Sequence, residues 1–565
     1  MIIRPFLDFM ILCSQHPLFT SIGLLGLWLL TRRRSRNVLG NADESWRKMR
    51  PVLVIVTAGV FISFLTTCFW YMTHDGYASD VEAMVTTVAW WVKTGGQLYH
   101  APDAAQQYSA LYGPAIYLVT GFYLDLLGPS IFASKVGSLL SLYISLTLLY
   151  LTIRRWVSNT LALGLTTIAV LLYWTCGTSS MLVRADPYLL AAVCLGMYSA
   201  GSPRRVLAVA GSALGVGLAV NLKLHSLLYM LPVLTLLDEH HGWRATVAAL
   251  GLGFVVVVAP FVLHDNISLL NYLSWLEISA HHGLELESLP HLLSRALFFA
   301  VPVLVPLSSG SWPADRPWMR RDLILVWIVG NLVVILLAMK PGAGQVHLLP
   351  IIPINMVFAA RLWPAEGMRG LLFPDMRISW RLGAVMSFLI AAIVSGSVSG
   401  YRSARLASSL MEHSSEITAE IGEILATHPG RTISMGYGGD GQYFHWTNLR
   451  PLLIFAGQPL LLDAIPIMDS RRAYREFSPA TIDAIEAGVI DLWLVPRQQQ
   501  PFSLPNWYPP HEEIFPEELR TRFAEHFRLE GRARFFDLWG WDRTASLGAI
   551  TIDTAADDED VASGD

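Results

Sequence analysis

The sequence predicts an α-helical, polytopic membrane protein that carries a small C-terminal α/β domain. Of its 565 residues, 53% are hydrophobic and only 15% are charged. The mean hydropathy of +0.45 lies well above the value typical of a soluble protein. Apolar runs recur along the chain up to about residue 400, and beyond that point helix-like and strand-like segments alternate as in a soluble domain.

Composition also argues against several other classes of protein. The net charge is −4 and no basic stripe carries interleaved aromatic residues, so we expect no nucleic-acid partner. The four cysteines lie inside or beside apolar runs without metal-ligand spacing, which predicts neither disulfides nor zinc. Arg32, Arg33 and Arg34 directly follow the first apolar run and no cleavage site precedes them. That run is therefore predicted to be an uncleaved span.

About twelve apolar runs could cross the roughly 30 Å of hydrocarbon in a bilayer. They lie at 9–30, 51–72, 136–153, 160–178, 185–200, 205–221, 224–237, 245–263, 292–308, 322–339, 345–361 and 382–400. Basic residues occupy every second loop between them, including 32–50, 154–155, 204–205 and 316–321. Because loops rich in lysine and arginine stay in the cytoplasm, the loop 73–135 and the tail from 401 are predicted on the outer face.

The large outer loop is predicted to hold two helices. In "SDVEAMVTTVAWWVKTGGQLY" (79–99), Ser79 and Glu82 have the spacing of a capping box, and Asp80 falls in the first turn, where the helix dipole favours an anion. The second stretch, "YGPAIYLVTGFYLDLLG" (112–128), is apolar and aromatic. The alternation of loops closes only if this stretch does not cross, so it is expected to lie along the membrane surface.

The tail reads as alternating helices and strands, which favours an α/β domain of Rossmann-like type. "GYGGDG" (436–441) lacks the spacing and the lysine of a phosphate loop, so we interpret it as a turn. The acidic end, 551–565, has the composition of a disordered segment. The expected helices cover 403–430, 479–488 and 516–527, and the expected strands cover 431–436, 459–464, 489–496 and 533–541.

Ionisable and polar side chains gather at the outer ends of the predicted spans. Such groups are costly in a membrane, so each is a candidate for function. They are His74, Asp75, Asp80, Glu82, Arg184, Asp186, Lys223, His225, His281, His282, Lys340, Gln345 and His347.

Each candidate also has a structural explanation. Asp80 and Glu82 suit the first turn of a helix. Arg184 and Asp186 can neutralise each other, and Lys223 can extend its ammonium group from an apolar span to the interface. Residue types alone do not decide between the two explanations.

The order of the motifs resembles that of the GT-C family of integral-membrane glycosyltransferases. Asp80 stands fifteen residues before Gly95, "LYGPAIYLVTGFYLDLLG" corresponds to the family's juxtamembrane helix, and "VRADPYLL" to its Arg-x-Asp-Pro-like motif. "GQVHLLPIIP", which contains His347, is similar to a later span of the family. The match covers about 51–400. Val81 follows Asp80 where the family often has glutamate, and the span within 1–50 lies outside the family's usual core.

This resemblance implies a GT-C-like fold of about twelve transmembrane helices and a sugar transfer. The donor would be a polyprenyl-phosphate sugar, and the acceptor a glycan, lipid or protein. Asp80 would be the catalytic base that takes the proton of the acceptor hydroxyl. Arg184, Lys223 and Lys340 would bind the donor phosphate and stabilise its growing charge.

The remaining candidates receive supporting roles in the same family interpretation. Asp186 and His347 would stand behind the phosphate-binding cations. His74, Asp75 and Glu82 would give acidic support or hold a divalent cation, which is the single cofactor considered.

The family interpretation also sets the domain organisation and the location. Residues 1–50 form an extra N-terminal helix with a basic cytoplasmic loop, 51–400 the catalytic membrane module, and 401–550 a periplasmic α/β domain. The protein is expected in a bacterial inner membrane. Two alternatives remain: a secondary transporter that uses Asp186, Lys223 and His225, and an inactive GT-C-like component of polysaccharide assembly. The sequence shows none of the interrupted, inverted repeats of many transporters.

Overall fold

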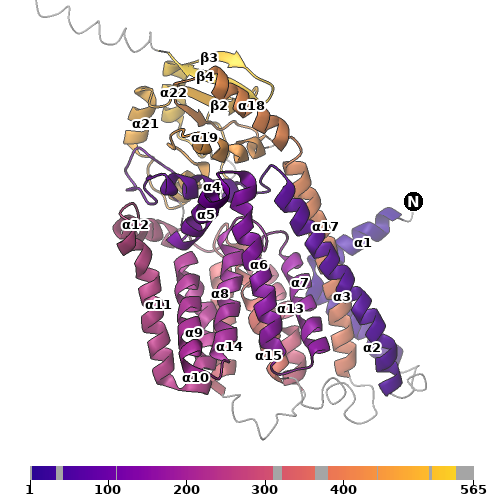
Figure 1. Ribbon diagram of the computed structural model, residues 1–565. Helices are drawn as coiled ribbons and strands as arrows, with labels where there is room; N and C mark the ends of the chain where they lie inside the picture. Colours follow the sequence, from indigo (N-terminus) through magenta and orange to yellow (C-terminus); the bar gives the residue numbers. More distant parts are fainter. Residues whose placement is uncertain are drawn as a thin grey trace, which may run out of the picture.

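The computed structural model describes residues 3–32, 42–109, 111–308, 321–362, 380–441, 443–507 and 512–542. Long helices form a bundle, and a small domain of short helices and strands covers one end of it (Figure 1). We call this end the domain-bearing end. Three short helices, α4 (Asp80–Lys93), α5 (Pro114–Leu127) and α12 (Leu269–Ala280), lie between the bundle and the domain.

The bundle confirms the predicted helical, multi-pass architecture. Among the described residues, seven helices are long and apolar enough to cross a membrane, or eight if one bent pair counts as a span. Several others are shorter, so the predicted number of twelve spans is not confirmed. The helices are α1 (Ile3–Gln15), α2 (Pro17–Arg32), α3 (Ala42–Thr73), α6 (Ile131–Ile153), α7 (Asn159–Thr175), α8 (Ala185–Ala200), α9 (Arg205–Leu222), α10 (Leu227–His241), α11 (Trp243–Leu263), α13 (Leu289–Leu307), α14 (Arg321–Ala338), α15 (Ile351–Leu362) and α17 (Trp380–Leu410).

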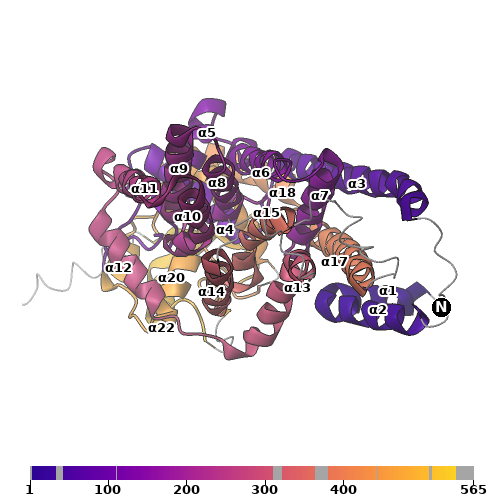
Figure 2. The ribbon, with the colours of Figure 1, turned by 90° about the horizontal axis from the view of Figure 1, so that it is seen from below.

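The first predicted span, 9–30, is broken into two helices. α1 and α2 meet at His16 with a bend of 108°. Pro17 begins α2, and proline cannot continue a preceding helix because it lacks an N–H and clashes with the turn before it. Arg295 Nη2 contacts the carbonyl oxygens of Ser14 and Gln15, at 3.4 and 3.3 Å, and so satisfies the end of α1. Seen from below, α1 and α2 lie beside α17 (Figure 2).

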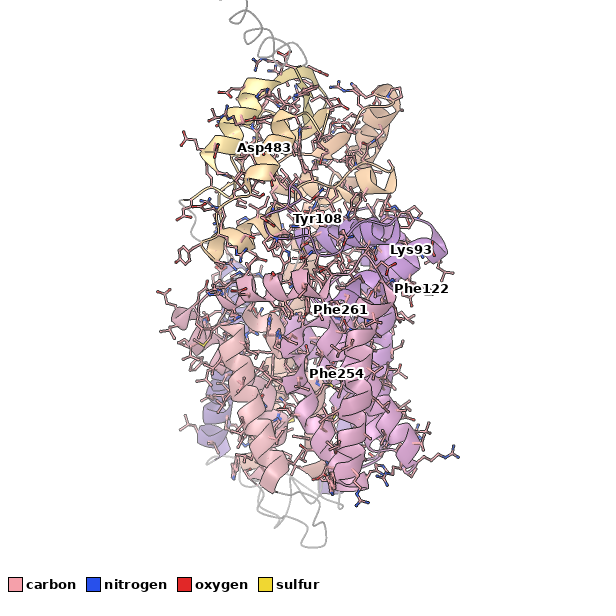
Figure 3. The ribbon with its side chains drawn as sticks, turned by 90° about the vertical axis from the view of Figure 1, so that its left-hand side faces the viewer. Lys93, Tyr108, Phe122, Phe254, Phe261 and Asp483 are labelled. Carbon is pink, nitrogen blue, oxygen red and sulfur yellow. The ribbon has the colours of Figure 1, made fainter. Side chains whose placement is uncertain are left out.

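Apolar side chains cover the outside of the bundle as well as its core. Figure 3 shows Asp483 in the C-terminal domain, Lys93 and Tyr108 at the junction, and Phe261 and Phe254 in the bundle. Phe254 is 67% exposed and belongs to α11, a helix that is apolar all round. A bilayer would cover such a surface.

The junction helices have clear local causes. Ser79 caps α4 by accepting a hydrogen bond from the N–H of Val81, at 3.3 Å. After α4, Gly95 takes a positive φ of 101°, which glycine adopts without strain. Pro114 stands in the first turn of α5, where its missing N–H costs nothing. α5, which covers most of the stretch 112–128, lies at the junction with α4 (Figure 1).

The C-terminal domain contains a mixed four-stranded sheet in the order β1-β2-β4-β3. The strands are β1 (Ile433–Met435), β2 (Leu492–Pro496), β3 (Phe527–Arg532) and β4 (Phe536–Trp541). β1 and β2 are parallel, whereas β4 is antiparallel to both β2 and β3. The α/β class is therefore confirmed, but the expected Rossmann-like sheet, which would be parallel, is wrong.

Two segments of this domain differ from expectation. The predicted strand 459–464 makes a single bridge between Leu462 and Gln107 of the large loop. The sequence predicts no strand at β3, since "FRLEGR" is polar and lacks an apolar pattern. In the structure this segment forms an exposed edge strand with a bulge. The helices are α18 (Ser414–Thr427), α19 (Pro451–Phe455), α20 (Ala464–Arg472), α21 (Pro479–Glu486) and α22 (Glu517–His526). The expected helix over 403–430 is split between the end of α17 and α18, and 551–565 lies outside the described residues.

Candidate functional site

Asp80 opens α4 at the contact between the membrane module and the C-terminal domain. Its Oδ1 accepts a hydrogen bond from the Ser79 hydroxyl at 3.2 Å, and its Oδ2 has no partner among the described residues. Arg450 of the domain donates from Nη2 to the Asp80 carbonyl oxygen at 3.2 Å and from Nε to Asp463 at 2.8 Å. Burial raises the pKa of Asp80, Arg450 opposes this rise and Asp463 adds to it. The result is a carboxylate with a raised pKa and with one buried oxygen that lacks a partner among the described residues.

Glu82 ties together three segments that surround Asp80. Its fully buried carboxylate accepts hydrogen bonds from the Tyr71 hydroxyl, from the N–H of Ala78 at 2.9 Å and from the N–H of Val183 at 3.2 Å. The predicted capping box is thus displaced by one residue, since Glu82 reaches Ala78 and not Ser79. The structure places Glu82 in a buried network that connects α3, α4 and the loop before α8.

Lys135 is a residue that the sequence interpretation missed. It is buried on α6 and donates from Nζ to the carbonyl oxygens of Tyr71, at 2.9 Å, and His74, at 2.7 Å. The ammonium group also lies 4.4 Å from the centre of the Tyr71 ring. It therefore closes the end of α3 and fixes the turn that leads to Asp80. Lys135 stands one residue before the predicted span at 136–153, and a lysine at the end of a span commonly extends to the membrane interface, so its sequence position gives no sign of a buried role.

The side chains of the other two residues predicted to support a metal make no hydrogen bond with the Glu82 carboxylate among the described residues. Asp75 is exposed, and His74 Nδ1 contacts the Trp70 carbonyl oxygen at 2.8 Å while its ring packs on Trp70. Within the described part of the chain, no three His, Cys, Asp or Glu side chains lie together as metal ligands. The structure does not gather His74, Asp75 and Glu82 into one site.

Two cations share one carboxylate at the start of α8. Lys223 Nζ lies 2.7 Å from Asp186 Oδ1, and Arg184 Nε lies 3.3 Å from Asp186 Oδ2. The Asp186 side chain is only 1% exposed, so this pairing keeps its charge in a buried place. The two Nη atoms of Arg184 make no hydrogen bond with a described residue, and the guanidinium interacts electrostatically with Asp80. Arg184 therefore has hydrogen-bond donors left for a ligand.

The remaining predicted residues lie next to Lys223 or across from it. The rings of His225 and His347 stack with centres 4.9 Å apart, and both rings interact electrostatically with Lys223. The Tyr229 hydroxyl donates to the His347 carbonyl oxygen at 2.8 Å. Lys340 donates to the Ser279 carbonyl oxygen at 3.2 Å, beyond His225. Asp186 and His347 thus stand behind Lys223, while Lys340 lies on another side of the site.

Helix α20 of the C-terminal domain reaches from one side of this region to the other. At its start, the N–H of Asp463 donates to the Gln107 carbonyl oxygen at 2.8 Å. At its end, Arg472 Nη1 donates to the Pro341 carbonyl oxygen at 3.1 Å, and His282 Nε2 contacts the Asp469 carbonyl oxygen at 3.1 Å. The helix is therefore fastened to both sides, and we call it the roof helix.

Ionisable side chains of the membrane module and of the roof helix are linked by ion pairs and by longer-range electrostatic interactions, and we call this set the ionisable ring. Each member forms an ion pair or interacts electrostatically with the next, and the last interacts with the first. The members of this ionisable ring, in order, are Asp80, Arg184, Asp186, Lys223, His225, Lys340, His282, Arg472 and Asp469.

Two members contributed by loops and the roof helix have perturbed pKa values. Burial raises the pKa of Asp469 to about 7, Arg472 opposes the rise and Asp80 adds to it. Burial, together with the nearby charge of Arg472, lowers the pKa of His282 to about 4, so this imidazole is neutral at pH 7. Perturbed groups gathered at one place are typical of functional sites. Asp469, Arg472 and the docking of α20 had no signal in the sequence.

Comparison with known proteins supports the fold. No protein-family model and no curated protein matches the sequence. The structure of ArnT from Cupriavidus metallidurans bound to undecaprenyl phosphate matches with a TM-score of 0.53 and 15% identity, over 88% of this chain and 99% of ArnT. The apo form of ArnT matches with a TM-score of 0.52 and 13% identity, over 89% and 99% of the two chains. ArnT is a GT-C protein, so these matches confirm the GT-C-like fold.

Proposed function

We propose that the protein is a membrane glycosyltransferase that moves a sugar from a polyprenyl-phosphate donor to an acceptor hydroxyl. One observation carries this proposal: a carboxylate oxygen of Asp80 has no partner among the described residues, and Arg184, which interacts electrostatically with Asp80, has Nη atoms that bond to no described residue. A base and an anion-binding cation are thereby brought to one place at the domain-bearing end. The binding of undecaprenyl phosphate by ArnT, which shares the fold, supports the choice of donor.

The ionisable ring supplies the groups that such a transfer needs. The acceptor oxygen attacks the anomeric carbon of the donor, the bond from that carbon to the phosphate oxygen breaks, and the phosphate leaves with the electron pair. Asp80 takes the proton of the acceptor hydroxyl. Arg184, with Lys223 beside it, stabilises the negative charge that grows on the phosphate.

The other predicted residues take indirect parts in this scheme. Asp186 forms ion pairs with both Arg184 and Lys223. His347 stacks on His225, the neighbour of Lys223. Lys340 lies further round the ionisable ring, where it can meet a second oxygen of the donor phosphate. The described residues do not fit a divalent cation held by the protein alone, so we derive no step through one.

The distribution of charge supports an orientation in the membrane. The last turn of α6 and the first turns of α9 and α11 lie at the end of the bundle remote from the C-terminal domain (Figure 1). Arg154 directly follows α6, Arg204 directly precedes α9, and Arg244 is the second residue of α11. By the positive-inside rule that end is cytoplasmic. The domain-bearing end, with the site and the domain over 401–550, would then face the periplasm of a bacterial inner membrane. The catalytic module would be 51–400, and 1–50 an addition to it.

Transfer by the purified protein tests the proposal directly. The protein in lipid nanodiscs would be incubated with a panel of radiolabelled polyprenyl-phosphate sugars and candidate acceptors, with and without a chelator. The label is expected to move from the polyprenyl-phosphate donor to the acceptor, whether the acceptor is water-soluble or a second lipid. Label that stays on the lipid across the full donor panel contradicts the proposal. Activity that survives the chelator shows that no removable metal ion is needed.

A further inference from the structure

Charge is divided unevenly between the two sides of the ionisable ring. Beside α8, two cations, Arg184 and Lys223, face the single carboxylate of Asp186. Under the roof helix the balance is reversed. Three carboxylates, those of Asp80, Asp463 and Asp469, meet two guanidinium groups, those of Arg450 and Arg472. The first side suits an anionic phosphate, and the second suits an acceptor that brings hydrogen-bond donors.

Asp469 is the carboxylate of the roof helix that remains available to a ligand. Asp463 is committed to Arg450 and to the N–H of Ile465. In contrast, no hydrogen bond joins the Asp469 carboxylate to a described residue, and its ion pair with Arg472 is long, at 3.6 Å. The side chain of Asp469 is 15% exposed and interacts electrostatically with Asp80.

We propose that Asp469 binds the acceptor and determines its class. In this arrangement, which rests on the proposed glycosyl transfer, Asp80 receives the reacting hydroxyl and Asp469 accepts a hydrogen bond from a second hydroxyl of the same molecule. The acceptor is therefore an uncharged polyol, such as a sugar that presents two neighbouring hydroxyl groups. Acceptors that carry a phosphate group close to the reacting hydroxyl are disfavoured.

The chemistry of carboxylates gives the reason for this selectivity. An ionised carboxylate can only accept hydrogen bonds, so at a pH above its pKa of about 7, where Asp469 is ionised, it needs a donor from the ligand. The second hydroxyl of a diol supplies that donor. A phosphate brings a further negative charge beside Asp80 and Asp469, and repulsion of this kind is how a site rejects a wrong partner. Asp469 forms and breaks no covalent bond, and the transfer balances as described for Asp80 alone.

Two matched acceptors and three variants test the proposal. The acceptors are a methyl hexoside, which is neutral, and the corresponding hexose phosphate. Asp469→Asn keeps the size of the side chain but lacks the charge, and Asp469→Glu keeps the charge. Asp483→Asn is the matched control, because Asp483 is exposed on α21, away from the junction (Figure 3).

The wild-type protein is expected to prefer the methyl hexoside at least tenfold in kcat/KM. Asp469→Asn should raise KM for the methyl hexoside by about tenfold, the value of one hydrogen bond to a charged group, with a small change in kcat. The preference for the neutral acceptor should shrink in Asp469→Asn and persist in Asp469→Glu. Asp483→Asn should behave as wild type.

Two results would overturn the role of Asp469 while leaving the transferase intact. One is a wild-type preference for the hexose phosphate. The other is an Asp469→Asn protein whose KM and preference equal those of the wild type, or whose kcat alone falls, as expected from a structural role. If Asp469→Asn does not fold, Asp469→Glu decides, because loss of the preference in that variant contradicts the proposal. A wild-type protein that transfers label from no donor removes the proposed function as well.

Discussion

The N–H of Val183 donates a hydrogen bond to the buried carboxylate of Glu82 over 3.2 Å. Glu82 stands two residues after Asp80, and Val183 stands one residue before Arg184. This single bond therefore fixes the first turn of α4 against the loop that carries Arg184. The proposed base and the proposed phosphate-binding cation are therefore held in register by Glu82, whose side chain is fully buried.

Replacing Glu82 by glutamine should disturb this register. The Glu82 carboxylate accepts hydrogen bonds from three donors, and the NH₂ group of a glutamine would face at least one of them. A buried donor left without an acceptor lowers the free energy of unfolding by about 1–3 kcal/mol. We expect Glu82→Gln to be inactivated at a lower temperature than the wild type in detergent. We also expect kcat to fall by a larger factor than the factor by which KM changes. Tyr71→Phe, which removes one hydrogen bond, should have a smaller effect. Unchanged stability and kcat in Glu82→Gln would contradict the positioning role.

Asp80→Asn should lower the rate of transfer by about 10²–10⁴-fold, the usual contribution of a general base. The change is close to isosteric, so the melting temperature and gel-filtration profile should match those of the wild type. Asp75→Asn is the matched control, because Asp75 is exposed in the turn before α4. A purified Asp80→Asn protein with wild-type kcat would remove the catalytic assignment.

The pH dependence of transfer should report the environment of Asp80. The base works in its ionised form, so transfer is lost as the pH falls through its pKa. Because burial and Asp463 raise that pKa, the loss should begin at a higher pH than the ordinary aspartate value of about 4. The charged groups that face Asp80 are Arg450 and Asp463 on one side, with Arg184 and Asp469 on the others.

A neighbouring variant checks the sign of this effect. Asp463→Asn removes a carboxylate that raises the pKa of Asp80, so the pKa of Asp80 should fall and the acid limb should move to lower pH. The measurement is kcat at saturating acceptor over a range of pH. An acid limb near pH 4 in the wild type, or one that moves upward in Asp463→Asn, would not fit this account.

Lys223→Met should destabilise the protein strongly. The change leaves the Asp186 carboxylate, which is 1% exposed, with Arg184 Nε at 3.3 Å as its remaining ion-pair partner. Removing one partner of a buried pair costs about 3–5 kcal/mol, because a charge is left uncompensated. The double variant Asp186→Asn/Lys223→Met should recover most of this loss. Thermal inactivation of Lys223→Met, Asp186→Asn and the double variant measures the coupling, and additive effects would show that the two side chains act independently.

The fold was predictable where local pattern decides structure. Apolar runs predicted the helices of the bundle, and the spacing of Ser79 and Glu82 predicted the start of α4. The topology then placed Asp80, Arg184 and Lys223 at the same membrane depth, which is where the structure brings them together.

The unpredicted features all depend on contacts between distant segments. Nothing local to Asp463 or Asp469 indicates that α20 docks on two loops of the membrane module. Lys135 looked like an interfacial lysine because its partners, the end carbonyls of α3, lie more than sixty residues earlier. The antiparallel β3 was hidden because an exposed edge strand does not need the apolar alternation that reveals a buried one.

The continuity of α17 has a mechanical consequence. This helix runs unbroken from the bundle through Leu410 and leads directly into the C-terminal domain (Figure 1). Each residue of an α-helix advances the chain by about 1.5 Å and turns it by about 100°. One added residue near its far end would therefore rotate the C-terminal domain relative to α4, whereas a whole added turn would lift it without much rotation. The length of α17 thus sets the register between Arg450 of the domain and Asp80 of the bundle side.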